Sequence, residues 1–299
     1  MARRITTTFS QRVSQPGYPG ADWMQRFIEE GIERFSAASA RVYCATWRSF
    51  LEELARRERD PLTASSADIQ SYLLQLKHLQ TRHRYARLLA RVYEYASSQR
   101  WLPFNPMPVL TPELTGALER SAPVAFREAD WRRLLEQLPA PLSPKEQRDQ
   151  TMVALLLGAG LRLEELRDLR LSQLTEAGSA LTVRLAGGTA KARTLTVDPL
   201  VAERVRAWQE LRLSAPVPGV LVFPDEKGGP LAANTVYRRI GRVLLRLKGI
   251  ALPPRLSAGV LRTTFARGLL KTESSATAQQ QLGHRRLGST LRMSQSMKT

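Results

Sequence analysis

Cysteine is almost absent from this sequence: among 299 residues there is one, Cys44. A single thiol excludes a disulfide framework and a cysteine-based metal site within one chain. Long apolar runs are also missing, because no stretch reaches the roughly 18 apolar residues that a membrane-spanning helix needs. The N-terminal segment MARRITTTFSQR is charged and has no apolar core, which is not the pattern of a secretory signal. These absences favour a cytoplasmic protein.

Acidic residues are scarce relative to basic ones: 27 Asp and Glu stand against 45 Lys and Arg, a formal net charge of +18. The basic residues are spread along the whole chain, as is typical of a folded protein with a long basic surface. The charge therefore favours a nucleic acid as the partner, and a nucleoid-associated location. Arginine far outnumbers lysine, so the base composition of the genome is the alternative explanation.

The chain is long enough for two domains that each bury a core. Residues 1–21 are irregular, which indicates either a flexible basic arm or a start without a role. Residues 22–105 show amphipathic helical patterns, and the clearest places apolar residues at i, i+4, i+7, i+8 and i+11 from Tyr43. These patterns predict a small helical bundle. Prolines then mark a linker at residues 106–122.

Residues 123–299 are predicted to form the second domain. Arg148 and Asp149 open a strongly apolar helical segment, TMVALLLG, which should lie at the centre of the core. Residues 181–186 and 194–197 alternate apolar and polar side chains around a glycine turn, a pattern typical of a β-hairpin. The sequence therefore predicts a mostly α-helical protein with a small β-hairpin or sheet, an α+β fold.

Two predicted helices carry a basic face, one within residues 82–96 and one within residues 234–248. Residues at i, i+3 and i+4 of a helix share a face, so the arginines of each segment form a ridge. Each ridge is either a contact surface for DNA phosphates or an ordinary solvated surface. The candidate DNA-binding residues on these ridges are Arg84, Arg87, Arg91, Arg238, Arg239 and Arg242.

Two stretches place basic residues beside glycine-rich turns: GAGLRLEELRDL, and the segment from residue 256 to residue 293. They contribute Arg162, Arg262 and His284. A guanidinium binds two phosphate oxygens at once and an imidazole donates a hydrogen bond to a third, so these residue types suit a phosphate group. Glu165, three residues after Arg162, either holds that guanidinium in place or saturates it as a structural ion pair.

The segments GLRLEEL, LRTTFARGLL and LGHRRLGSTLR resemble, in this order and spacing, the motifs of the tyrosine recombinase (phage integrase) family. The resemblance covers the chain from about Asp22 to Met293. It implies a core-binding (SAM-like) domain at residues 22–105 that clamps double-stranded DNA, and an integrase-type catalytic domain at residues 123–299.

The resemblance also implies a reaction in which a tyrosine attacks a DNA phosphodiester, without a metal or another cofactor. Two arginines stabilise the transition state in this reaction, and Arg162 and Arg262 match their positions. A lysine and histidines move protons, and His284 matches one of the histidines.

Three positions depart from the family's motifs. Gly188 stands where the hairpin lysine is usual, and Gly259 stands where a histidine usually precedes the second arginine. Met293 stands where the tyrosine nucleophile is usual, and none of the seven tyrosines follows the last motif. A thioether has no proton to lose, and the neighbouring Ser294 is rotated by about 100° along a helix.

The hairpin keeps Lys191 and Arg193 as candidate DNA contacts, and Lys191 either replaces the displaced catalytic lysine or contacts only backbone phosphate. We expect a DNA-binding protein of site-specific recombination or integration in which strand cleavage is impaired or absent. On DNA it would form a homo- or hetero-oligomer, beside a catalytically intact recombinase. Two alternatives stay open: an active recombinase with a non-standard or partner-supplied nucleophile, and a decayed copy without a function.

Overall fold

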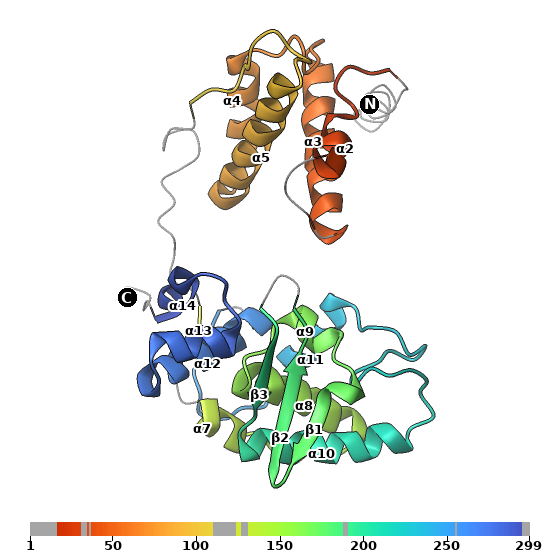
Figure 1. Cartoon of the computed structure of the whole chain (residues 1–299), viewed down its shortest axis with the longest axis vertical. Coiled ribbons are helices and arrows are strands. Elements are labelled where there is room, and N and C mark those ends of the chain that lie inside the picture. The colour runs from red at the N-terminus through yellow and green to blue at the C-terminus, as the bar shows by residue number, and fades with distance from the viewer. Residues whose placement is uncertain are drawn as a thin grey trace. The chain divides into compact units, whose positions relative to one another are not determined.

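The computed structural model describes residues 17–30, 35, 37–109, 124–126, 131–187, 191–254 and 256–294. The chain divides into two compact units, Met1–Arg120 and Ser121–Thr299, and each is described on its own (Figure 1). Most of the predicted arm, most of the predicted linker and Gly188 lie outside the described residues. Within the described ranges, no helix has the length and apolar character to cross a membrane.

The first unit contains four helices among its described residues: α2 (Trp23–Glu30), α3 (Ala37–Arg56), α4 (Ser66–Gln75) and α5 (Leu79–Ser98). Their apolar faces meet in one core that is rich in aromatic rings. Trp47 stacks on Trp23 with 6.0 Å between ring centroids, and its indole N–H donates to the Gly20 backbone oxygen at 2.8 Å. The apolar stripe predicted on α3 is therefore its buried face, with Tyr43 half-buried at one end.

The second unit is built around α8 (Pro144–Gly158), which is buried from residue 150 to its last residue. The larger helices that pack against it are α7 (Trp131–Glu136), α10 (Pro199–Ser214), α11 (Ala233–Leu244) and α12 (Ala258–Thr272). α8 begins at Pro144, before the Arg148 that the sequence indicated. The reason is that the Ser143 hydroxyl accepts a hydrogen bond from the Glu146 N–H, and proline fits the first helical turn.

A three-stranded antiparallel sheet lies beside these helices, in the order β1 (Leu174–Ala177), β2 (Ala180–Leu185), β3 (Arg193–Thr196). β2 and β3 form the hairpin that the sequence predicted, and together with the helices they confirm the α+β class. β1 was not predicted, because only one of its four residues is buried and the alternation is too weak. The register pairs Leu185 with Arg193, and the side chains of Arg193 and Leu195 both point inward.

The remaining elements of this unit are short: α9 (Leu163–Arg167), the 3-10 turn η1 (Leu171–Gln173), α13 (Ser275–Leu282) and α14 (Leu287–Ser294). Ser274 begins α13 by accepting the Thr277 N–H at 3.1 Å, and Gly283 ends it with a left-handed φ of 63°. α12, α13 and α14 pack against one another (Figure 1). The turns before α9 and after α13 carry the residues discussed next.

Candidate functional site

The site begins with a turn that only glycine can make. Gly160 follows α8 with a φ of 61°, and a Cβ atom added to it would lie 2.4 Å from a ring carbon of Phe265. This turn leads to Arg162, the N-cap residue of α9, whose backbone N–H donates to the Glu165 carboxylate at 2.7 Å. The Arg162 side chain is 23% exposed, so its guanidinium is accessible from solvent while its backbone is held.

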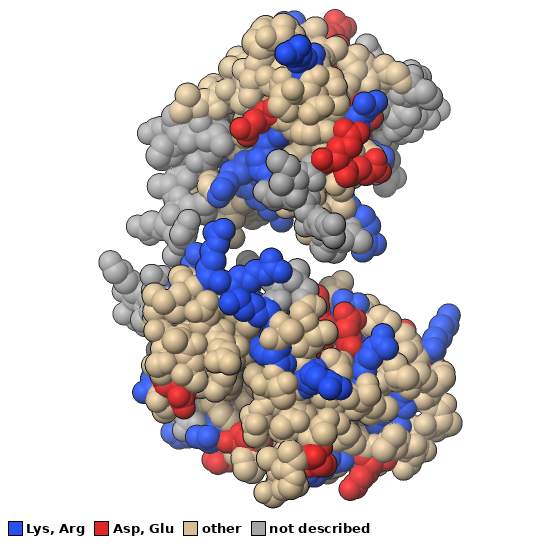
Figure 2. All heavy atoms as spheres, viewed as in Figure 1, with Lys and Arg blue, Asp and Glu red and all other residues tan. Residues whose placement is uncertain are grey.

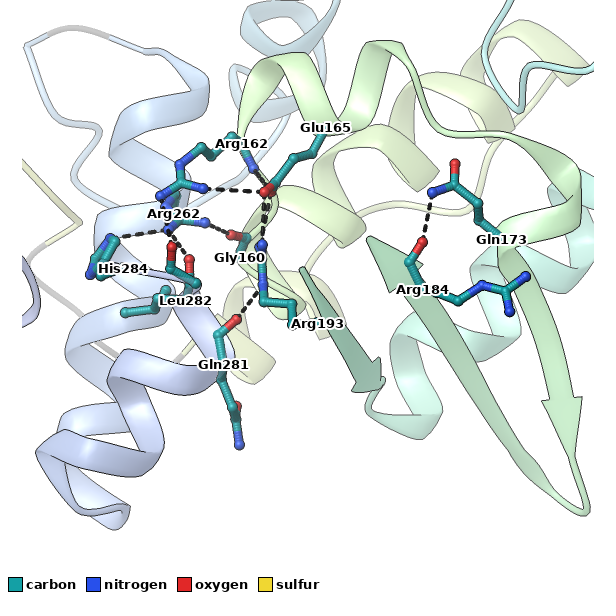
Figure 3. A network of polar contacts seen from close by, with 11 residues as sticks. Gly160, Arg162, Glu165, Gln173, Arg184, Arg193, Arg262, Gln281, Leu282 and His284 are labelled. Atoms are coloured by element: carbon teal, nitrogen blue, oxygen red, sulfur yellow. Dashed lines mark hydrogen bonds and ion pairs between the residues drawn. The ribbon is translucent and has the colours of Figure 1, made fainter. Parts of the chain in front are cut away.

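Arg262 lies at the centre of the site, on α12, and is 5% exposed (Figure 3). One terminal nitrogen donates to the backbone oxygen of Gly160, and the other donates to the backbone oxygen of Leu282. The same guanidinium lies 3.1 Å from Nε2 of His284. Arg262 therefore ties the turn before α9 to the turn after α13, which are far apart in the sequence.

His284 is 7% exposed and makes polar contacts through both ring nitrogens. Nδ1 lies 2.8 Å from the hydroxyl of Thr290, and Nε2 lies against the Arg262 guanidinium. Arginine can only donate, so Nε2 accepts and Nδ1 carries the proton that is donated to Thr290. Burial, followed by the positive charges of Arg262 and Arg162, lowers the pKa of this imidazole from 6.5 to about 4. His284 is therefore neutral at neutral pH.

Glu165 joins two arginines. Arg193 donates to its two carboxylate oxygens at 2.7 and 2.9 Å, whereas the Arg162 guanidinium reaches it once, at 3.3 Å. Burial acts to raise the pKa of Glu165, but the hydrogen bonds from Arg193 and from the Arg162 N–H outweigh it and leave that pKa lowered. The contacts match neither interpretation of Glu165 fully: the carboxylate is bound mainly by Arg193, and it holds the Arg162 guanidinium through one long contact.

The charges of the site do not cancel. Three guanidinium groups, on Arg162, Arg193 and Arg262, lie around one carboxylate, on Glu165. Burial and the charges of Arg162 and Arg193 lower the pKa of Arg262 to about 9, which still leaves it protonated at neutral pH. The excess positive charge in a partly buried site favours the binding of an anion.

The structure brings together Arg162, Arg262 and His284, named here the Arg–His cluster. Lys191 lies beside it, because its backbone N–H donates to the Gly283 oxygen at 3.4 Å. Gly259 lies one helical turn before Arg262, and an added Cβ atom would meet only the Ser257 hydroxyl at 3.6 Å, so there is room for a side chain.

Met293 lies on α14, half-buried against Phe265, Ala266 and Leu282. Its backbone oxygen accepts a hydrogen bond from Nε of Arg267 at 3.1 Å. The neighbouring Ser294 is exposed, and its hydroxyl donates to the Leu291 backbone oxygen at 2.6 Å. Residue 293 is therefore an apolar packing residue, and the serine hydroxyl is bonded to its own helix.

The predicted basic ridges keep only part of their exposed charge. Arg84, Arg87, Arg238 and Arg242 are exposed. Arg91 lies over the rings of Phe27 and Phe35 at 5.2 and 5.4 Å from their centroids. Arg239 is half-buried, and its Nε lies 3.9 Å from the Asp149 carboxylate. Figure 2 shows other Lys and Arg side chains gathered on the second unit near the hairpin end of β2 and β3.

Arg193 departs from the expectation of a DNA contact. Its side chain is 4% exposed, and besides the carboxylate of Glu165 it donates through Nε to the backbone oxygen of Gln281 at 2.7 Å. It lies under the site instead of on the surface. The signal in the sequence was its place two residues before Leu195, on the buried face of a strand. The role of Thr290 was missed as well, because the sequence does not show which hydroxyl reaches His284.

Within the described ranges, no group of three or more His, Cys, Asp or Glu side chains is arranged to hold a metal ion.

Known proteins resemble this chain in both sequence and fold. The model of the phage integrase family matches residues 125–297. Tyrosine recombinase XerC of Stutzerimonas stutzeri (strain A1501) is 37% identical over 145 residues, 48% of this chain and 46% of that protein, so the chain matches about half of its length. Tyrosine recombinase XerC of Pseudomonas entomophila (strain L48) is 31% identical over 220 residues, 71% of this chain and 69% of that protein.

A solved structure has the same fold. The XerH site-specific recombinase bound to palindromic difH substrate, a post-cleavage complex, matches with a TM-score of 0.73 at 15% identity, and the match covers 98% of this chain and 92% of that one. At this identity the likeness concerns the fold alone. The family model matches more than half of the sequence, and the chain belongs to the phage integrase family, the family of the tyrosine recombinases.

Proposed function

We propose that this protein binds double-stranded DNA in site-specific recombination or integration, and holds a phosphodiester against the Arg–His cluster without cleaving it through residue 293. One observation carries the proposal: Arg162, Arg262 and His284 converge, while the residue at the nucleophile position is a methionine packed into an apolar cluster. The solved XerH recombinase was determined bound to a palindromic difH substrate, and the net charge of +18 of this chain favours DNA as the ligand.

The chemistry of the cluster fits a phosphodiester. Arg162 is partly exposed and Arg262 retains N–H groups beyond those bonded to backbone oxygens, so both can donate to non-bridging oxygens. A neutral His284 carries no charge to repel the arginines, and its unprotonated Nε2 positions Arg262 by accepting a hydrogen bond from it rather than by donating to the phosphate. Lys191, beside the cluster, is proposed to contact a backbone phosphate.

The covalent step lacks a nucleophile at the expected position. A thioether cannot be deprotonated, and Met293 contributes to packing instead. Ser294 is next along α14, but its hydroxyl donates to Leu291 and is rotated by about 100° from residue 293. Both observations support binding without cleavage over an active recombinase with a non-standard nucleophile.

A covalent-adduct assay tests the proposal. The protein is incubated with nicked suicide duplexes from candidate target sites and resolved on denaturing gels, while binding is measured on the same duplexes by anisotropy. We expect binding that weakens in Arg262→Ala, and no adduct. An adduct formed by the wild type would refute the non-catalytic function, and its loss in Ser294→Ala would identify the alternative nucleophile. A protein that binds no duplex would indicate the decayed copy.

We also propose that residues 22–105 form a core-binding domain, that residues 106–122 are the linker, and that residues 123–299 form the integrase-type domain. In a recombination complex this protein would occupy one position beside a catalytically intact recombinase. A mixing experiment tests the assembly. An intact recombinase is added to the same duplex with and without this chain. A further mobility shift of the duplex that requires both proteins supports a mixed complex, and purely additive binding contradicts it.

A further inference from the structure

The carboxylate of Glu165 is shared between two arginines in an unequal way. Its oxygen Oε1 accepts from Arg193 at 2.7 Å and from the Arg162 guanidinium at 3.3 Å. Its oxygen Oε2 accepts from Arg193 at 2.9 Å and from the Arg162 backbone N–H at 2.7 Å. A carboxylate has about four acceptor sites, so Glu165 is saturated. The guanidinium of Arg162 has the longest of these four contacts.

Arg193 also connects the segments that form the site. It lies at the start of β3, binds Glu165 on α9, and donates through Nε to Gln281 on α13 (Figure 3). The turn after α13 packs directly on it, because a Cβ atom added to Gly283 would lie 2.7 Å from one of its terminal nitrogens. That turn leads to His284, so Arg193 supports both sides of the Arg–His cluster from below.

Removing the Arg193 side chain would leave each oxygen of Glu165 with one donor fewer, in a site where the carboxylate is 12% exposed. A buried carboxylate that loses its partner takes the nearest replacement, because an unpaired buried charge is costly. The nearest replacement is the Arg162 guanidinium, already 3.3 Å away. A two-pronged Arg162–Glu165 pair would then withdraw both the charge and the donors of Arg162 from the cluster.

We propose that Arg193 is a positioning residue for anion binding: it occupies Glu165 and thereby leaves the guanidinium of Arg162 open to a phosphate. The inference rests on the proposed function, in which the Arg–His cluster binds phosphate. It assigns no contact with DNA to Arg193 itself, whose side chain is 4% exposed. The identity of the residue matters as well, because a lysine cannot donate to both carboxylate oxygens in the same fixed geometry.

The test uses the full chain and inorganic phosphate as the probe, followed by the ring resonances of His284 in NMR spectra and assigned with His284→Gln. We expect Arg193→Met to bind phosphate about tenfold more weakly than the wild type, and Arg193→Lys to fall between them. The double variant Arg193→Met/Glu165→Gln should recover most of the affinity, because the carboxylate that captures Arg162 is gone. Thermal denaturation confirms that each variant is folded.

A matched control is available on the surface of the same unit. Arg206 donates to both oxygens of Glu176 at 2.9 and 2.8 Å, and the two side chains are partly exposed, at 39% and 49%. Arg206→Met should therefore leave phosphate binding unchanged. If Arg193 has a purely structural role, the double variant should bind phosphate no better than Arg193→Met does, and this result would overturn the proposal. Wild-type phosphate affinity in Arg193→Met would overturn it as well.

If phosphate does not bind to the wild type, that result counts against the proposed function alone. A second measurement then still tests the positioning role of Arg193. The crystal structure of Arg193→Met, or of Arg193→Lys if the first is unfolded, shows the Arg162–Glu165 contact directly. We expect two short guanidinium–carboxylate hydrogen bonds in place of the single one at 3.3 Å. An unchanged single contact would refute the positioning role.

Discussion

Acidification should destabilise this protein through His284. Burial and the neighbouring arginines lower the pKa of its imidazole from 6.5 to about 4 in the folded chain. In the unfolded chain the imidazole returns to a value near 6.5. The folded pKa lies below the unfolded one, so the buried neutral form contributes its full stability above about pH 6.5. That contribution is lost as the pH falls through the window from about 6.5 to about 4.

The size of this loss in stability follows from the difference between the unfolded pKa of 6.5 and the folded pKa of about 4. Each pKa unit corresponds to about 1.4 kcal/mol, so about 3 kcal/mol of unfolding free energy depends on this one group. A typical domain has a total stability of about 5–15 kcal/mol, which makes the effect measurable. Urea unfolding of the wild type and His284→Gln, in buffers without phosphate or sulfate, should show their stability difference shrinking by about 3 kcal/mol across the window.

The control is His78→Gln, since His78 is exposed at the start of α5 and outside the second unit. This substitution should leave the unfolding free energy close to that of the wild type, because the His78 side chain makes no capping hydrogen bond to α5. Nitrogen-15 NMR of the ring of His284 gives a direct check, and it should report the neutral tautomer with the proton on Nδ1. An imidazole that titrates near 6.5, or a constant difference between wild type and His284→Gln, would refute burial of His284 against the arginines.

Three further predictions concern single positions. Gly160→Ala should destabilise the protein by about 2–4 kcal/mol more than Gly178→Ala in urea unfolding, because both have a positive φ but only Gly160 lacks space for a Cβ atom. Equal losses would contradict this reasoning. Met293→Tyr should not yield efficient strand exchange on suicide duplexes, because two other motif positions also depart from the family; efficient exchange would show that these do not matter. Arg238→Ala should reduce the salt dependence of DNA binding by about 0.9 on a log–log plot, as expected for one lost phosphate contact, and an unchanged slope would remove it from the interface.

The members of the Arg–His cluster could be predicted because each lies in a short motif beside a glycine turn, and both can be recognised from residues that are close in the sequence. Gly160 and Gly283 lie next to cluster residues in the sequence, and each has a positive φ that a glycine adopts at little cost. The backbone oxygens that bind Arg262 could not be predicted. They depend on how closely the turn at Gly160 approaches Leu282, and this approach is set by the packing of α8, α12 and α13.

The exposure of the charged residues could be predicted only in part. A helical period of 3.6 places Arg84, Arg87 and Arg91 on one ridge, but it does not show that two aromatic rings lie under Arg91. Likewise, Arg239 lies on the predicted basic face yet is held near Asp149 of α8. Sequence periodicity identifies the face of a helix, whereas the neighbouring element decides which side chains on that face remain in solvent.

The structure also gives Arg262 a role that does not depend on catalysis. Arg262 donates to backbone oxygens on two turns that are distant in the sequence, so it connects α9 and α13 in the absence of any ligand. Replacing a buried arginine in such a position leaves carbonyl groups without donors, at a cost of about 1–3 kcal/mol for each. Retention of Arg262 is therefore expected from stability alone, and it is weak support for phosphate binding.

Arg162 is the more informative residue, because its guanidinium makes two long contacts with the part of the chain that the structure describes, both at 3.3 Å, to Glu165 and Gly283. Arg162→Met should therefore cost little stability in urea unfolding and weaken phosphate binding by about tenfold. Arg262→Met should reduce both. A protein in which Arg162→Met leaves phosphate affinity intact would have kept the cluster as a structural feature, and the binding function proposed for it would be wrong.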